Sequence, residues 1–303
     1  MKRTYNVTYR EAHQWASSFL KTAGKEEDIA YHFLLGCQKW TVTDWYLKCH
    51  QDMPKEEWEF YQAGIQRIVE EDYPYQYILG ESYFYGRPFY VNESVLIPRF
   101  DTELLIDQVK HSLKEGQLSP SARVVDIGTG SGILAITLAL ECPTLKVTAT
   151  DLSKEALQVA QENAERLGAK LTFRSGDLYT PLEGEKFDLI LSNPPYIAHG
   201  EEGEMGVDVL KYEPPMALFA EEEGYAIYKR LAKDLASFLN PGGLLMVECG
   251  FKQAQKVAKI FQKSVKASSI RIIKDYNGID RVIYLKQGDD GASCQPNVTK
   301  SMN

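Results

Sequence analysis

The 303-residue sequence predicts an α/β domain built on a mostly parallel β-sheet and preceded by a small helical domain. Three observations lead to this fold class. From Ser121 onward, apolar strands alternate with helical stretches, which is typical of a parallel sheet covered on both faces. Before about residue 80, apolar residues recur at helical spacing instead. Between these parts, residues 81–100 hold aromatic and β-branched runs (Tyr83–Val91, then Val95–Ile97) around turn residues, which indicates a β-hairpin linker.

The helical domain is expected over residues 1–80. Thr8-x-x-Glu11 fits a capping box, in which a hydroxyl and a carboxylate bind the free amides at a helix start. Behind it, Trp15 and Phe19 fall on one apolar face, and Gly24 suits the helix end. Pro54 suits the first turn of a later helix. These apolar faces are explained by a helical core, and no residue among them suggests chemistry.

The α/β domain is expected over residues 101–287. Its strands are predicted at Arg123–Ile127, Lys146–Asp151, Lys170–Arg174, Phe187–Ser192, Leu244–Glu248, Ile270–Lys274 and Arg281–Leu285. The clearest helices are predicted at Ser153–Leu167, Tyr225–Leu239 and Gln253–Val265. Residues 288–303 are polar and rich in Gly, Asp and Ser, so a disordered tail is expected there.

Composition narrows the function classes. The net charge of −8 lowers the expectation of a nucleic-acid substrate, because phosphate binding needs a basic face. Residues 1–80 hold nine Lys or Arg against twelve Asp or Glu, so they form no basic arm. The five scattered cysteines lack CxxC spacing, so neither disulfides nor a metal site is expected. No membrane segment or signal peptide is recognisable, and a cytoplasmic location is expected.

A glycine turn follows the first predicted strand, in the run Val124-Val125-Asp126-Ile127-Gly128-Thr129-Gly130-Ser131-Gly132. Such a turn lets a ligand approach the backbone at the carboxyl end of a strand. The dinucleotide fingerprint requires its third glycine at position 133, which is Ile133 here. Asp126 suits a ligand with an ammonium group better than a pyrophosphate. The turn therefore predicts S-adenosylmethionine, which carries an ammonium, a sulfonium and no phosphate.

Two more acids follow the next strands. Asp151 ends the second strand, where a carboxylate can accept hydrogen bonds from both ribose hydroxyls. Asp177 in Gly176-Asp177-Leu178 follows the third strand, where a side chain or backbone group can reach the adenine. Each acid alone could be a helix cap or a turn residue. Acids at three successive strand ends instead indicate one cofactor site.

The fourth predicted strand ends in Asn193-Pro194-Pro195-Tyr196. An amide or aromatic amine nitrogen is a poor nucleophile, because its lone pair is delocalised. The Asn193 side-chain oxygen and the Pro194 carbonyl could accept both N–H bonds of such an NH2 group and direct the lone pair at a methyl group. The prolines fix the backbone, and Tyr196 could stack on a planar group. The motif predicts methylation of a planar nitrogen.

With these motifs, the sequence resembles the protein-glutamine N5-methyltransferases of peptide chain release factors, the PrmC/HemK family. The resemblance extends to about Gly288. Besides the glycine turn and Asn193–Tyr196, it rests on Gln76-Tyr77-Ile78-Leu79-Gly80, Phe84-Tyr85-Gly86, Leu96-Ile97-Pro98-Arg99-Phe100-Asp101-Thr102-Glu103, Tyr212-Glu213-Pro214, Ala217-Leu218 and Asp280-Arg281. Two departures are Phe100, where the family usually has proline, and Phe219-Ala220-Glu221, where a glycine-containing turn is common.

The resemblance implies a helical domain that recognises the substrate, a hairpin linker, and a seven-stranded Rossmann-like methyltransferase domain with one antiparallel strand. The implied substrate is the glutamine of the Gly-Gly-Gln loop of class I release factors, and the cofactor product is S-adenosylhomocysteine. Residues Gly128–Gly132, Asp151, Asp177, Leu178 and Asn193 are implied to line the cofactor site. Asn193, Pro194, Pro195 and Tyr196 are implied to hold the glutamine amide.

Three other functions stay open from the residues. An amino-methyltransferase acting on adenine or guanine of DNA or rRNA shares Asn-Pro-Pro-Tyr, but would need a basic surface or a base-reading domain. A nicotinamide or flavin oxidoreductase is disfavoured by Ile133 and Asp126. A catalytically dead relative would have a broken glycine turn or would lack Asn193, and both are intact. We expect a monomeric enzyme with no direct contact to nucleic acid or membrane.

Overall fold

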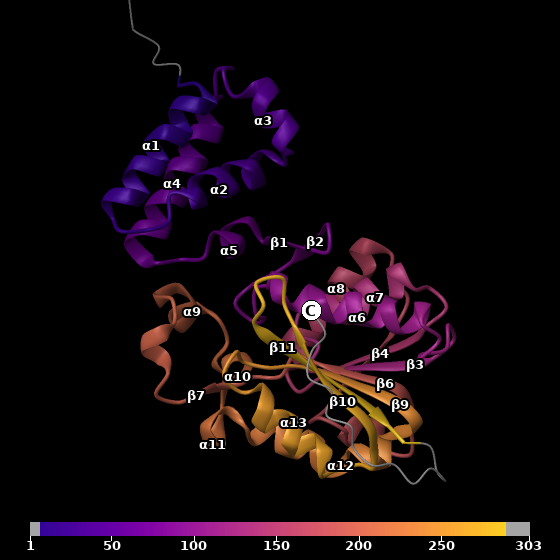
Figure 1. Ribbon diagram of the computed structural model, residues 1–303. Helices are drawn as coiled ribbons and strands as arrows, with labels where there is room; N and C mark the ends of the chain where they lie inside the picture. Colours follow the sequence, from indigo (N-terminus) through magenta and orange to yellow (C-terminus); the bar gives the residue numbers. More distant parts are fainter. Residues whose placement is uncertain (1–6, 289–303) are drawn as a thin grey trace, which may run out of the picture. The chain divides into compact units, whose positions relative to one another are not determined.

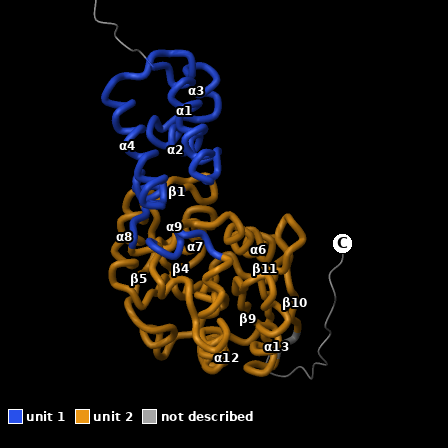
Figure 2. The backbone as a smooth tube through the Cα atoms, turned by 90° about the vertical axis from the view of Figure 1, so that its left-hand side faces the viewer, with its two compact units in different colours: residues 1–82, 91–93, 205–212 blue, residues 83–90, 94–204, 213–303 orange. Residues whose placement is uncertain are grey.

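The computed structural model describes residues 7–288 and divides into two compact units. Residues up to 82, with 91–93 and 205–212, form the helical unit, and residues 83–90, 94–204 and those from 213 form the α/β unit. Figure 2 colours the two units. Gly288 is described, but the rest of the predicted tail lies outside the described residues.

The helical unit has its own apolar core. Its helices are α1 (Tyr9–Thr22), α2 (Asp28–Gln38), α3 (Val42–Lys48), α4 (Lys55–Glu71), α5 (Tyr75–Leu79) and α9 (Val207–Tyr212). The predicted capping box is confirmed, because the Glu11 amide donates to the Thr8 hydroxyl and the Thr8 amide donates to the Glu11 carboxylate. Phe33 and Tyr61 are fully buried and stacked, and the Tyr61 hydroxyl donates to the Ala30 carbonyl over 2.8 Å.

Segment 205–212 belongs to the helical unit although it follows the Asn-Pro-Pro-Tyr motif in sequence. The Tyr212 hydroxyl donates to the Glu71 carbonyl over 2.9 Å, and its ring lies 4.7 Å from that of Tyr73. Lys211 pairs with Asp72 at the end of α4. These contacts fix α9 on the helical unit, which sequence position alone did not indicate.

The α/β unit holds one seven-stranded sheet in the order β10-β11-β9-β6-β3-β4-β5 (Figure 1). Its strands are β3 (Arg123–Ile127), β4 (Lys146–Asp151), β5 (Thr172–Ser175), β6 (Phe187–Ser192), β9 (Leu239–Glu248), β10 (Ala267–Lys274) and β11 (Asp280–Gln287). Strand β11 runs antiparallel to both of its neighbours, β9 and β10, and the other pairings in this sheet are parallel. The expected seven strands with one antiparallel member are confirmed.

Helices cover both faces of the sheet, as predicted. The main ones are α6 (Glu103–Lys114), α7 (Ile133–Glu141), α8 (Lys154–Leu167), α12 (Ala226–Phe238) and α13 (Ala254–Gln262). Neighbouring strand residues point to opposite faces. Val124 accordingly joins a core cluster with α6, α7 and α8, whereas Val125 joins a cluster with α12 and α13.

Short elements complete the description. They are β1 (Glu81–Phe84), β2 (Arg87–Tyr90), η1 (Phe100–Thr102), η2 (Thr180–Leu182), β7 (Ile197–Ala198), η3 (Glu202–Glu204), α10 (Pro215–Leu218), β8 (Phe219–Ala220) and α11 (Glu221–Gly224). Within residues 7–288, no helix is long and apolar enough to span a bilayer.

Several predicted boundaries were wrong. Strand β10 starts at Ala267 rather than Ile270, β11 extends to Gln287 rather than Leu285, and α13 ends at Gln262 rather than Val265. The hairpin is confined to β1 and β2, and Val95–Ile97 is irregular because the Ile97 amide donates to the Glu213 carboxylate instead of a strand partner. Strand β5 starts at Thr172 rather than at Lys170. Strand β9 starts at Leu239, which had been assigned to the preceding helix, because Leu239 pairs with Phe187 of β6 before a bulge.

Candidate functional site

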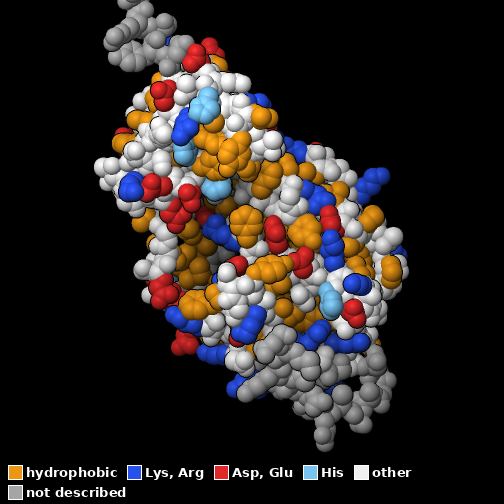
Figure 3. All heavy atoms as spheres, turned by 45° about the horizontal axis from the view of Figure 1, so that its top comes forward, with side chains coloured by type: hydrophobic (Ala, Val, Ile, Leu, Met, Phe, Trp, Pro, Cys, Tyr) orange, Lys and Arg blue, Asp and Glu red, His pale blue; other side chains and the backbone are white. Residues whose placement is uncertain are grey.

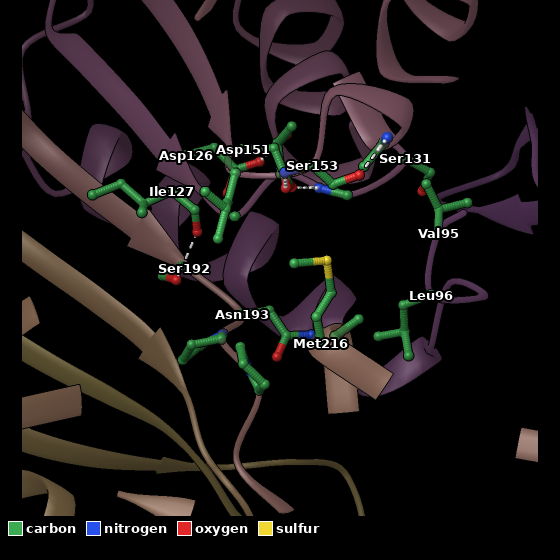
Figure 4. A pocket seen from close by; sticks show the side chains of 18 of the residues that line it. Val95, Leu96, Asp126, Ile127, Ser131, Asp151, Ser153, Ser192, Asn193 and Met216 are labelled. Carbon is green, nitrogen blue, oxygen red and sulfur yellow. Dashed lines mark hydrogen bonds between the residues drawn. The ribbon is translucent and has the colours of Figure 1, made fainter. Parts of the chain in front are cut away.

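A cavity of about 180 Å³ opens at the carboxyl ends of β3, β4 and β6, within the α/β unit (Figure 4). Four chain segments that end strands form most of its wall: 126–131, 151–153, 176–178 and 192–195. The rest of the lining comes from the segment between Ser94 and Thr102, from helices and from the loop after Glu213: Ser94, Val95, Leu96, Pro98, Arg99, Thr102, Ile133, Leu134, Ala156, Pro214, Met216, Ala217, Ile227 and Arg230. This is the place where open α/β sheets bind ligands.

The structure brings most of the sequence-predicted site residues together around this cavity. Those that line it are Asp126, Gly128, Thr129, Gly130, Ser131, Asp151, Asp177, Leu178, Asn193, Pro194 and Pro195. Gly132 and Tyr196 lie outside the lining. The Tyr196 ring packs against the core cluster of α12 and α13, and its carbonyl accepts from the Gln253 side chain over 2.8 Å.

The glycine turn is held by strand β4. The amides of Gly128 and Thr129 both donate to the Thr150 carbonyl over 2.9 Å. Gly128 and Gly130 have positive φ angles of 75° and 57°, and a Cβ on either would meet no protein atom within 4 Å. The space in front of the turn is therefore open, so a bound molecule can approach the backbone closely.

Asp126 is buried at the end of β3, where one carboxylate oxygen accepts from the Thr129 hydroxyl over 2.6 Å. The other oxygen, Oδ1, has no partner of hydrogen-bond geometry among the described residues, although the Ala135 amide is close enough to favour its charge. Burial raises the pKa of Asp126 to about 7 against these hydrogen bonds. A cationic ligand would stabilise the ionised form of this carboxylate.

Asp151 and Asp177 differ in what they can still bind. The Asp151 oxygens accept from the amides of Gly130 (2.8 Å) and Ser153 (2.9 Å), and each retains a lone pair for a ligand hydroxyl. Burial raises the pKa of Asp151, while those amides oppose the shift. Asp177 is half-exposed and forms an ion pair with Arg230 at 2.5 Å, so its carboxylate is already partly committed.

Asn193 follows β6, whose last residue, Ser192, donates to the Ile127 carbonyl over 2.7 Å and so ties this strand end to β3. Asn193 Nδ2 donates to the Thr102 hydroxyl over 3.1 Å. The Thr102 hydroxyl donates in turn to Glu248 Oε2 over 2.7 Å. The Asn193 amide nitrogen is thus committed to the protein, which leaves its oxygen as the acceptor for a substrate N–H.

Sequence reasoning assigned no role to Thr102, Glu248, Arg99 or Glu213. Glu213 is buried, pairs with Arg99 at 2.5 Å and accepts from the Ile97 amide over 3.2 Å, so it anchors the segment that leads to Thr102. Glu248 ends strand β9. The rule that found Asp126 and Asp151, an acid at a strand end, would also have found Glu248.

Comparison with known proteins gives two matching family models. The model described as "PrmC N-terminal domain" matches residues 11–80, and the one described as "Methyltransferase small domain" matches residues 100–210. Among solved structures, a methyltransferase from Pyrococcus furiosus aligns with a TM-score of 0.51 at 20% identity. That alignment covers 75% of this chain and 98% of the other, and it supports the fold.

Curated relatives are similar over nearly their whole length. A release factor glutamine methyltransferase from Enterococcus faecalis is 41% identical, over 90% of this chain and 97% of its own. One from Bacillus subtilis is 38% identical, over 91% and 96% respectively. Similarity of this extent, with both domain models in the expected order, places the chain in a family. It belongs to the release factor glutamine methyltransferases.

Proposed function

We propose that this chain transfers a methyl group from S-adenosylmethionine to the side-chain amide nitrogen, N5, of the glutamine in the Gly-Gly-Gln motif of class I peptide chain release factors. The observation that carries the proposal is the hydrogen bond from Asn193 Nδ2 to Thr102, beside the cavity that the glycine turn lines. It leaves the Asn193 oxygen as the acceptor, as an amide substrate requires. The family supplies the identity of the amide.

The residues around the cavity fit S-adenosylmethionine. This molecule supplies a methyl group on a sulfonium, which is electrophilic without further activation. Asp126 offers an unpartnered oxygen to a cation, and Asp151 has lone pairs for the two ribose hydroxyls. The open space before Gly128 and Gly130 admits a ligand against the backbone, and Asp177 with Leu178 forms the wall expected to face the adenine.

The substrate amide would lie against Asn193 and Pro194. The Asn193 oxygen and the Pro194 carbonyl can each accept one of the two N–H bonds, which turns the nitrogen lone pair toward the methyl group. Pro194 and Pro195 remove backbone freedom, so these acceptors are positioned before the substrate arrives. Tyr196 has its ring outside the cavity lining, so we propose that it contacts the release factor next to the glutamine rather than the cofactor.

We assign release-factor recognition in part to the helical unit. Its helix α3 exposes Val42, Tyr46 and Leu47, each by more than half of its surface. On the face shown in Figure 3, basic and acidic side chains are interspersed, which suits a protein substrate better than a phosphate backbone. If these exposed residues of α3 contact the release factor, Tyr46→Ser should raise the KM for the release factor and leave the affinity for the cofactor unchanged.

We further propose that the protein is a monomer that acts in the cytoplasm without direct contact to nucleic acid.

The decisive experiment is methyl transfer in competition. The full-length protein is incubated with methyl-labelled S-adenosylmethionine, an unmethylated release factor, rRNA and DNA. Label should appear on the release factor, and a release factor with alanine in place of the Gly-Gly-Gln glutamine should take none. Asn193→Ala should abolish labelling while the cofactor still binds. Label on nucleic acid, or on another residue of the release factor, would overturn the proposal.

A further inference from the structure

The hydrogen-bonded chain Glu248–Thr102–Asn193 joins three segments that are far apart in sequence. Thr102 is separated from Glu248 by 146 positions and from Asn193 by 91. Strands β6 and β9 are adjacent and parallel, with Ser192 opposite Val247, so Asn193 and Glu248 leave the same sheet edge side by side. Thr102 and Glu248 are both buried, at 1% and 2% exposure, so water does not satisfy their polar atoms.

Which group donates and which accepts in this hydrogen-bonded chain follows from the number of hydrogen atoms that each side chain can donate. A threonine hydroxyl has one hydrogen, and an ionised carboxylate can only accept. Ionised Glu248 therefore takes the Thr102 hydrogen, and Thr102 must accept from its other neighbour. Asn193 can satisfy it only with its NH2 group, which leaves the Asn193 oxygen for the substrate.

We propose that Glu248, acting through Thr102, is a positioning residue that holds the Asn193 amide in its methyl-transfer orientation. A proton on Glu248 reverses the donor and acceptor order of these hydrogen bonds and inactivates the site. With that proton, Glu248 donates to Thr102, Thr102 donates to the Asn193 oxygen, and the amide turns over. Asn193 then presents two N–H bonds to a substrate NH2 that has only N–H bonds to offer. This inference rests on the proposed function, because it concerns the acceptor for that substrate amide.

The surroundings of Glu248 put this proton within reach of neutral pH. Burial raises the pKa of Glu248 to about 7, opposed by the Thr102 hydrogen bond. Among the charged neighbours, Asp101 raises the pKa of Glu248, whereas Arg281 and Arg99 lower it. Arg281 also forms ion pairs with Asp101 at 3.0 Å and with Asp275 at 3.1 Å, so its charge does not act on Glu248 alone. The remaining titratable neighbours, Tyr196, Tyr228 and Cys249, have pKa values raised by burial and stay neutral in this range.

The test compares wild type with Glu248→Gln, Thr102→Val and Thr102→Ser in methyl transfer to a release factor at saturating cofactor. Wild-type kcat should fall on the acid side with a midpoint near pH 7. Glu248→Gln should remove that dependence, because its side chain no longer titrates, and lower kcat at pH 8. Thr102→Val should lower kcat by about 10- to 100-fold with unchanged cofactor affinity, and Thr102→Ser should restore most of the rate.

Thr137→Val is the matched control, because Thr137 is equally buried and its hydroxyl has no partner among the described residues. It should leave kcat and its pH dependence unchanged. A second readout avoids activity: the side-chain amide NMR signals of Asn193 should titrate with a midpoint near pH 7 in wild type and stay constant in Glu248→Gln.

The proposed function fails if wild type transfers no methyl group to the glutamine. The inference alone fails if wild type is active but Glu248→Gln keeps the wild-type acid limb, or if Asn193 titrates alike in both proteins. It also fails if Thr137→Val loses as much activity as Thr102→Val, since the loss would then reflect core packing.

Discussion

Asn163 on α8 connects the β-hairpin to the glycine turn, and its removal gives a sharp stability prediction. Its side chain is fully buried. Its oxygen accepts from the Tyr90 amide over 2.6 Å, and its nitrogen donates to the carbonyls of Tyr90 and Ser131, both over 2.9 Å. Asn163→Ala removes three hydrogen bonds from backbone groups, at about 1 kcal/mol each, so we expect about 3 kcal/mol less stability.

The assay is urea unfolding followed by circular dichroism, because the four tryptophans all lie in the helical unit and fluorescence would report on that unit. Glu162→Ala is the control: Glu162 is the preceding residue of the same helix, half-exposed, and paired with Arg166 at 3.7 Å. It should cost less than about 0.5 kcal/mol. Equal losses for the two variants, or less than about 1 kcal/mol for Asn163→Ala, would refute the assignment of these bonds as structural.

Three further predictions concern the site. Asp151→Asn should weaken S-adenosylmethionine binding by about 10- to 100-fold in calorimetry, because charged hydrogen bonds to the ligand are lost; an unchanged Kd would contradict the ribose assignment. Gly132→Ala, with φ at 86° and its Cβ 2.6 Å from Ile136 Cδ1, should lower the Tm, whereas Gly128→Ala should mainly lower cofactor affinity. Finally, folding raises the pKa of Glu248, so the native state binds its proton more tightly than the unfolded state. The free energy of unfolding should therefore fall as the pH rises from about 4.5 to about 7, and Glu248→Gln should make this fall smaller. An equal decrease of the urea midpoint over this pH range in both proteins would contradict the prediction.

The elements of the cofactor site were predictable from the sequence because they are local. A glycine turn after an apolar strand needs only a few consecutive residues to be recognised, and β3, β4 and β6 have their predicted bounds. Acids at the ends of parallel strands must meet at one sheet edge, so Asp126 and Asp151 could be placed together without coordinates. The strand boundary at Leu239 could not be predicted, because it depends on the pairing of Leu239 with Phe187 ahead of a bulge.

What the sequence alone determined was therefore the succession of the seven strands along the chain, the helices that correspond to α8, α12 and α13, the glycine turn and the motif at Asn193. Only the tertiary structure decided which way the Asn193 amide faces, since its partners Thr102 and Glu248 lie far away in the chain. It also placed Tyr196 outside the cavity lining and segment 205–212 in the helical unit. The physical reason is the same in each case: these features depend on contacts between distant segments, and no local residue pattern encodes such contacts.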